Sequence, residues 1–143
     1  MNLNDQELLQ LVYKNAEMGR DGLDHLIERT EDRDFRRTLA EQFAEYQFVM
    51  DEARTRLDAF GQEPKGSSTM AKTAAQWMGD MKCNMDSSST KLAEMVIEGS
   101  TKGVIKLTRE MNNYKGVDEK TKALAERLLR TEQANIEQLR SFL

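Results

Sequence analysis

Apolar residues recur at alternating steps of three and four along most of this chain, and this spacing constrains the fold more than any other feature. Such a period places the apolar side chains on one face of an α-helix, whereas a half-buried strand needs alternation with a period of two. The strong helix formers Ala, Leu, Glu, Lys, Arg, Gln and Met dominate almost everywhere. No run of β-branched residues bounded by turn residues occurs, so we expect no strands. The pattern predicts an all-α protein.

Turn signals divide the chain into four long helices and one short helix. The single proline, Pro64, lies in the clearest linker, at 62–67. Gly61 and Gly116 suit the left-handed position that follows a helix, and Asp118 suits an N-cap. Either Asp32 or Asp34 can cap the second helix, and the polar run 86–90 can cap the third long one.

These boundaries predict one domain over residues 1–143, an antiparallel up-down-up-down four-helix bundle. Its parts are a hairpin at 4–61, the linker at 62–67, an extra short helix at 68–85 before the third long helix, and a hairpin at 88–142. The apolar stripes expected to form the core are Leu9, Val12, Ala16, Gly19, Leu23 and Leu26; Phe35, Leu39, Phe43, Tyr46, Met50, Ala53, Leu57 and Phe60; Leu92, Val96, Gly99, Gly103, Leu107 and Met111; and Leu124, Leu128, Glu132, Asn135, Leu139 and Phe142. Glycines inside the third stripe favour the close approach of a neighbouring helix.

Charge and cysteine content exclude several classes of partner and compartment. The net charge is −4 with both signs mixed, which argues against nucleic acid or an anionic membrane as the main partner. No stretch approaches 18 uncharged apolar residues, so no membrane span is expected. The N-terminus lacks the features of a signal peptide, and the lone Cys83 cannot form an intramolecular disulfide. We therefore expect a cytoplasmic protein.

The motifs of common enzyme classes are missing. There is no Gly-rich phosphate loop after a strand, no G-x-S-x-G and no Cys-x-x-Cys. His25 is the only histidine, and it lies on a different predicted helix from Cys83. We expect His25 to be a partly exposed residue near a helix C-terminus. The sequence therefore leans towards a protein without enzymatic activity.

Two groups of residues are candidates for binding a metal ion. Glu132 and Asn135 fall on the apolar stripe of the last helix, although Asn135 stands where a Glu-x-x-His motif would need histidine. A satisfied core hydrogen bond, to Tyr13 or Tyr46, is favoured over metal binding there. The second group surrounds Cys83 and could hold Cu(I), although packing is favoured for it too. This group consists of Met70, Met78, Met81, Cys83 and Met85.

Several segments of the chain match the pattern of a known family: Glu17-Met18-Gly19, 39–43, 66–70, Trp77-Met78, the break at 86–90, Glu98-Gly99 and the terminal helix bearing Glu132. The match is a resemblance to the small bacterial four-helix proteins of ferritin-like fold and unknown function. It implies a ferritin-like bundle with a short Trp-bearing helix before the third long helix. Of a ferritin-type carboxylate site it would leave Glu17, Glu45, Glu98 and Glu132, with no imidazole ligand.

The leading functional hypothesis is a soluble, non-enzymatic bacterial bundle without a cofactor that acts through protein contacts or in a stress response. The alternative is a carboxylate-bridged di-iron binding protein or oxidase that uses the four glutamates. The short helix carries Met70, Trp77 and Met81 on one side, which favours a homodimer or another protein partner.

Overall fold

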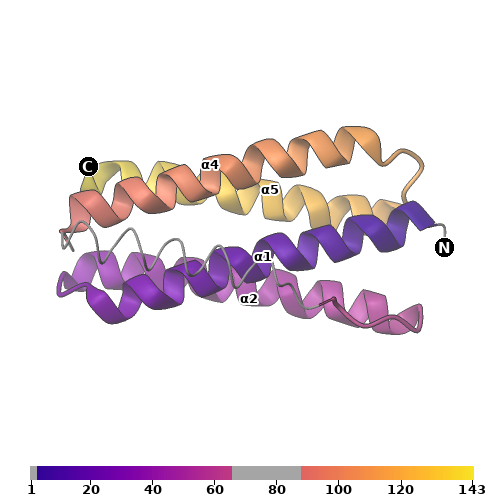
Figure 1. Ribbon diagram of the computed structural model, residues 1–143, viewed down its shortest axis with the longest axis horizontal. Coiled ribbons are helices and arrows are strands. Elements are labelled where there is room, and N and C mark those ends of the chain that lie inside the picture. Colours follow the sequence, from indigo (N-terminus) through magenta and orange to yellow (C-terminus); the bar gives the residue numbers. More distant parts are fainter. Residues whose placement is uncertain (1–2, 66–87) are drawn as a thin grey trace.

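The computed structural model describes residues 3–65 and 88–143, and within these ranges the chain is helical with no strand (Figure 1). The helices are α1 (Leu3–Arg29), α2 (Arg33–Ala59), α4 (Ser89–Asn113) and α5 (Glu119–Leu139), followed by a single 3₁₀ turn, η1 (Arg140–Phe142). The predicted all-α class and the four long helices are confirmed. The predicted short helix at 68–85 lies outside the described residues.

Short side chains begin three of the helices as the sequence predicts. Asp32 caps α2 and accepts hydrogen bonds from the backbone N–H groups of Asp34 and Phe35, so Asp32 rather than Asp34 is the cap. Ser88 caps α4 and Asp118 caps α5 in the same way.

Glycines follow two of the helices in the backbone conformation expected for them. Gly61 and Gly116 have φ angles of 71° and 72°, in the left-handed region that glycine adopts without strain. Both predicted helix ends are therefore confirmed.

The order of the helices differs from the predicted up-down-up-down succession. Helices α1 and α2 form one antiparallel hairpin and α4 and α5 form another, but α2 and α4 run in the same direction (Figure 1). The predicted order is therefore wrong, and the succession is up-down-down-up. The cause is the connection between the hairpins, which begins at one end of the bundle and must reach Ser88 at the other. Its described start folds back along α1, where Gln10 bonds the backbone of Glu63 and Lys65.

All four helices contribute to one core. Each hairpin packs extensively within itself, and the α2–α5 and α1–α4 contacts close the bundle. The predicted stripes supply most of the buried hydrophobic residues, which are Leu8, Leu9, Val12, Tyr13, Ala16, Leu23, Leu26, Phe35, Leu39, Tyr46, Val49, Met50, Ala53, Leu57, Leu92, Ala93, Val96, Leu107, Leu124, Ala125, Leu128 and Leu139. Phe60 is an exception: it lies just past the end of α2 and is 36% exposed.

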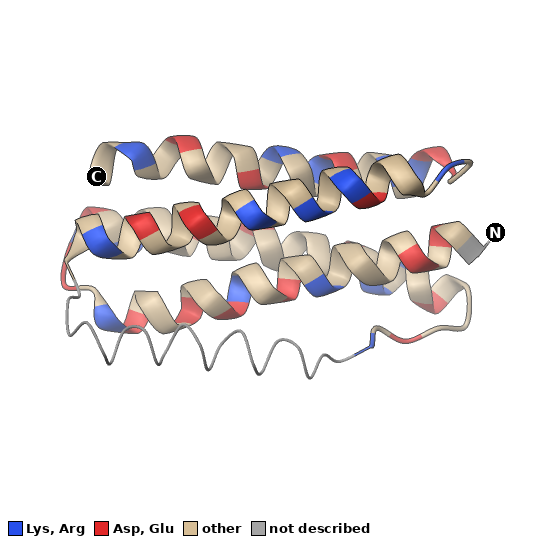
Figure 2. Cartoon of the chain, turned by 45° about the horizontal axis from the view of Figure 1, so that its top comes forward, with Lys and Arg blue, Asp and Glu red and all other residues tan. Residues whose placement is uncertain are grey.

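Acidic and basic residues are interspersed along all four helices, without a large region of one sign (Figure 2). This agrees with the small net charge of −4. None of the described helices has an apolar stretch long enough to cross a membrane.

Candidate functional site

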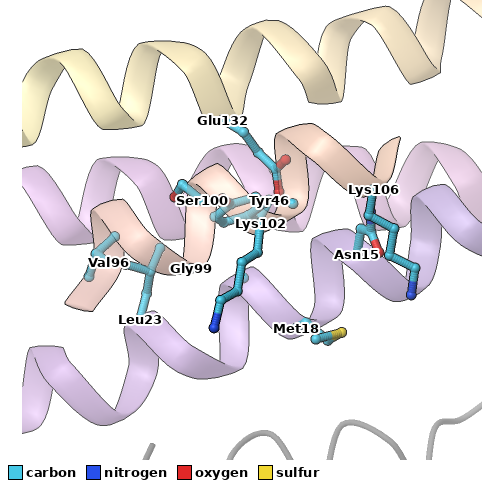
Figure 3. Close-up of a pocket in the computed structure, with 12 residues that line it drawn as sticks. Asn15, Met18, Leu23, Tyr46, Val96, Gly99, Ser100, Lys102, Lys106 and Glu132 are labelled. Carbon is cyan, nitrogen blue, oxygen red and sulfur yellow. The ribbon is translucent and has the colours of Figure 1, made fainter. Parts of the chain in front are cut away.

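A cavity of about 270 Å³ lies midway along the bundle, between α1 and α4, with α2 and α5 at its inner end (Figure 3). Its deep part is formed by buried side chains, among them Tyr46 and Glu132, and its outer part by the half-buried Met18 and two exposed lysines. The lining residues are Asn15, Met18, Gly19, Leu23, Tyr46, Val96, Gly99, Ser100, Lys102, Gly103, Lys106 and Glu132.

Glycines on α1 and α4 make room for this cavity. Gly19, Gly99 and Gly103 place three positions without side chains on its walls. Two of them are also contact points for side chains from the partner helices. A Cβ atom at Gly19 would lie 2.5 Å from Cζ of Tyr46, and one at Gly103 would lie 2.6 Å from each carboxyl oxygen of Glu132. A close contact therefore explains Gly103, but a side chain makes it and not the approach of a neighbouring helix that the sequence predicted.

Glu132 is the most unusual residue of the site. It is 3% exposed, and its Oε2 atom has no hydrogen-bond partner among the described residues. Burial raises the pKa of the carboxyl group to about 8, because an ionised carboxylate loses its hydration there. With no ligand bound, Glu132 therefore carries a proton at neutral pH.

Tyr46 lies next to this carboxyl group with its ring against Gly19 (Figure 3). Burial raises the pKa of its hydroxyl group far above the ordinary value, and the charge of Glu132 raises it further. Hydrogen bonding to the side chains of Asn135 and Ser100 opposes part of this shift. The hydroxyl group of Tyr46 is therefore a neutral donor at any physiological pH.

A second polar group of the pocket is also left unpaired. Asn15 on α1 is 6% exposed, and its Nδ2 donor has no hydrogen-bond partner among the described residues. Buried polar groups usually find a partner, so Asn15 and Glu132 are two unsatisfied polar groups on the wall of one cavity.

Two lysines of α4 flank the outer part of the pocket. Lys102 and Lys106 are exposed, and neither forms an ion pair with a carboxylate of the described residues. Their side chains extend over α1, with the ammonium groups away from Glu132 (Figure 3). They give the entrance a positive potential.

The four glutamates of the predicted iron site are not brought together. Only Glu132 lines the pocket; Glu45 and Glu98 are exposed, and Glu17 is half-buried. Glu45 instead pairs with Arg127 at 3.4 Å. In the described part of the chain, no three His, Cys, Asp or Glu side chains are grouped as metal ligands would be. Residues of the hypothetical Cu(I) group fall in 66–87, outside the described residues.

The predicted burial of Glu132 and Asn135 is confirmed. The predicted satisfied hydrogen bond of Glu132 is not found for Oε2. Tyr46 is its neighbour, whereas the hydroxyl group of Tyr13 accepts a hydrogen bond from Arg54 at 2.7 Å. His25 is half-buried near the C-terminal end of α1, as predicted, and it does not line the pocket.

Sequence reasoning missed Asn15 and Ser100. Ser100 directly follows Gly99, which belongs to the stripe of small residues. A polar residue next to this glycine could have indicated a polar group where two helices leave space between them. Asn15 precedes Ala16 of the first stripe. A polar residue beside an apolar stripe has the same sequence pattern whether it faces solvent or lines a pocket, so spacing alone could not single it out.

Comparison with known proteins places the chain in a family. The model of the "Domain of unknown function (DUF2383)" family matches residues 6–113, which is most of the chain. The chain belongs to this family. A crystal structure of a DUF305 fragment from Deinococcus radiodurans is similar over 98% of this chain and 95% of that one, with a TM-score of 0.63 and 12% identity. That likeness shows a shared helical fold. No curated protein matches the sequence. The expected relationship to helical proteins of unknown function is confirmed.

Proposed function

We propose that this protein is a non-enzymatic binding protein that holds one small molecule in the pocket at Glu132. The observation that carries the proposal is the unpaired Oε2 atom of Glu132, which is buried and yet lines a cavity open to solvent. A buried polar group without a partner costs about 1–3 kcal/mol. A ligand that donates a hydrogen bond to this atom recovers that free energy on binding.

The size and lining of the cavity favour a compact ligand. Its volume of about 270 Å³ lies just below the roughly 300–1,000 Å³ of pockets for drug-sized molecules. Apolar walls with a few convergent polar groups are typical of such sites. The ligand that fits is therefore somewhat smaller than a typical drug-sized molecule.

The chemistry of the lining favours binding over catalysis. Among the described residues, the pocket offers a carboxyl group and the hydroxyl groups of Tyr46 and Ser100, and no histidine lines it. Hydroxyl nucleophiles need an adjacent base to become reactive. Glu132 is protonated at neutral pH and cannot serve as that base without first losing its proton.

Amide NMR spectra of the full chain, titrated with a library of small polar molecules, test this proposal. We expect the shifts to cluster at Gly19, Gly99 and Gly103, which lie on the pocket walls. Val96→Phe, which fills one end of the pocket, should abolish them, whereas Ala123→Phe on an exposed face should not. Shifts that are absent, or that survive Val96→Phe unchanged, would contradict a binding role for the pocket.

We also propose that the fold is related to ferritin-like proteins. The parallel direction of α2 and α4 supports this relationship. Two such helices need a long connection between them, and ferritin-like bundles have one long crossover between their hairpins. An iron function would need carboxylates beside Glu132, and Glu17, Glu45 and Glu98 do not line its pocket. Metal analysis of protein purified without chelator or a metal-affinity tag tests that alternative directly.

Self-association, a bacterial stress role and contacts with other proteins stay predictions. The expected homodimer rests on Trp77 and its neighbours, which lie outside the described residues. Sedimentation across protein concentrations tests it: Trp77→Ala should lower the mass of an interface-mediated dimer while sparing helicity. A wild-type chain that sediments as a monomer at high micromolar concentration would rule the dimer out.

A further inference from the structure

The polar and apolar groups of the pocket are arranged in order along the helix axes. Leu23 and Val96 form one end, Glu132 lies at the middle with Tyr46 and Ser100, and Asn15 and Lys106 form the other end (Figure 3). Asn15 and Leu23 are eight residues apart on α1, which corresponds to about 12 Å along the helix axis. Gly19, where the Tyr46 ring packs, is one turn from each of them. The pocket therefore has an apolar end, an acidic centre and a donor end.

We infer that the pocket binds an apolar α-amino acid, with the ammonium group at Glu132, the carboxylate at Asn15 and Lys106, and the side chain against Leu23 and Val96. This inference rests on the proposed binding function and names the class of ligand. An α-amino acid carries all three groups on one carbon atom, so a ligand with its ammonium group at Glu132 can direct the other two groups to opposite ends of the pocket.

The centre of the pocket suits an ammonium group. Glu132 presents an unpaired oxygen at the inner wall, and Ser100 beside it adds a hydroxyl oxygen that can accept. A charged donor is the strongest partner for a buried carboxyl group. A bound ammonium group also supplies the positive charge that the buried, ionised form of Glu132 lacks.

The donor end suits a carboxylate. Nδ2 of Asn15 is a buried donor without a described partner, and Lys106 next to it has no ion pair among the described residues. Lys106 and Lys102 also oppose a ligand that carries positive charge alone, because both flank the entrance. A simple amine or a polyamine therefore fits less well than a zwitterion.

The remaining end suits an apolar side chain. Leu23 and Val96 are both almost fully buried, and neither brings a polar side-chain atom to the cavity wall. Burying a ligand's methyl groups there gains free energy without leaving a polar group unpaired. A branched aliphatic amino acid such as leucine is small enough for the cavity of about 270 Å³.

Isothermal titration calorimetry on the full chain at pH 7 tests the inference with four probes. The probes are L-leucine, isoamylamine (leucine without its carboxylate), isocaproate (leucine without its ammonium group) and glycine (without the apolar side chain). We expect leucine to bind one per chain and at least about tenfold more tightly than each of the others, since each lacks one of the three interactions.

Matched variants locate the two charged contacts. Glu132→Gln should weaken leucine binding at least about tenfold, whereas Glu137→Gln on the exposed face of the same helix should not change it. Lys106→Gln should weaken it about threefold and remove most of its salt dependence. Lys122→Gln, an exposed lysine on α5, should leave both unchanged.

The outcomes separate the ligand class from the binding function. Binding of isoamylamine or isocaproate as tight as that of leucine, lost in Val96→Phe, would overturn the amino-acid inference and leave the proposed pocket function standing. Leucine binding that persists in Glu132→Gln and Lys106→Gln would also overturn the inference. If no probe binds and no library compound shifts the pocket amides, both the inference and the proposed function fail.

Discussion

The carboxyl group of Glu132 on α5 lies against the backbone of Gly103 on α4, so closely that a Cβ atom there would be 2.6 Å from both carboxyl oxygens. The α1–α2 hairpin has an equivalent contact, in which an aromatic ring takes the place of the carboxyl group. The ring of Tyr46 on α2 lies against Gly19 on α1, where a Cβ atom would be 2.5–2.8 Å from three ring carbons. In each hairpin a glycine of the first helix thus accepts a polar side chain from the second. Both side chains line the same cavity.

Gly103→Ala should destabilise the protein by about 1 kcal/mol, measured by urea unfolding. Alanine gains roughly 1 kcal/mol over glycine inside a helix. Its methyl group would nevertheless stand closer to the Glu132 carboxyl group than atoms approach in folded proteins, and overpacking of this kind typically costs about 1–3 kcal/mol. The expected net loss reflects the limited freedom of a buried side chain to move away.

A double-mutant cycle isolates this contact. In a Glu132→Ala background the obstacle is gone, so Gly103→Ala should become neutral or stabilising by up to about 1 kcal/mol. An equal loss in both backgrounds would show that Gly103 is needed for a reason other than the Glu132 carboxyl group.

Gly19→Ala should cost more than Gly103→Ala, about 2 kcal/mol in the same measurement, after the same helix gain of roughly 1 kcal/mol is subtracted. The obstacle here is the rigid ring of Tyr46, which is 2% exposed and is held among core residues. An aromatic ring cannot move aside by rotating a terminal group as a carboxyl group can. If Gly19→Ala proves the milder of the two substitutions, the ring has room to shift that this packing does not show.

The contrast between these two glycines illustrates what the sequence could predict. The three-and-four spacing placed Tyr46, Gly19, Gly103 and Glu132 on the inner faces of their helices, and the structure confirms this. Spacing fixes which face a residue occupies, but it does not fix which residue of another helix it meets. The pairing depends on the axial offset between helices, which the turns and the packing of the whole core set together.

The direction of the second hairpin was unpredictable for a related reason. Short turns force neighbouring helices to be antiparallel, and this rule correctly predicted the α1–α2 and α4–α5 hairpins. The connection between Gly61 and Ser88 is long enough to reach either end of the bundle, so its length allowed both topologies.

The positions of Glu17, Glu45 and Glu98 could not be predicted either. These residues border their stripes, and small helix rotations decide whether such flanking residues face the core or solvent.

Asp118→Ala should lower the free energy of unfolding by about 1 kcal/mol at pH 7. The Asp118 side chain accepts a hydrogen bond of 2.7 Å from the backbone N–H of Thr121 at the start of α5. Asp118→Asn keeps an acceptor and should cost less, and Asp24→Ala at an exposed position within α1 serves as the control.

The same cap predicts a loss of stability in acid. The hydrogen bond from Thr121 lowers the pKa of Asp118, because it favours the ionised carboxylate. A lowered pKa in the folded state contributes stability above the unfolded pKa, near 4, and loses it as the pH falls through the folded value. The difference between wild type and Asp118→Asn should therefore shrink between pH 5 and pH 2, as followed by urea unfolding at each pH. A difference that is constant over this range would show that ionisation of Asp118 is irrelevant to the cap.

Glu132 predicts the opposite behaviour at higher pH. Its pKa rises from 4.5 to about 8 on folding, so the unfolded chain releases this proton first and stability falls as the pH increases between those values. At about 1.4 kcal/mol per pH unit, the full shift corresponds to a loss of up to roughly 5 kcal/mol.

The variant Glu132→Gln tests this prediction, because it has no carboxyl group to ionise. Its free energy of unfolding should be about equal to that of wild type near pH 4.5. The variant should become progressively more stable than wild type up to about pH 8, with a constant difference beyond. Urea unfolding of both proteins from pH 4 to pH 9 measures this difference, and Glu137→Gln, at an exposed position of the same helix, should follow wild type throughout. Parallel curves for wild type and Glu132→Gln would mean that the carboxyl group ionises in the folded protein as easily as in water.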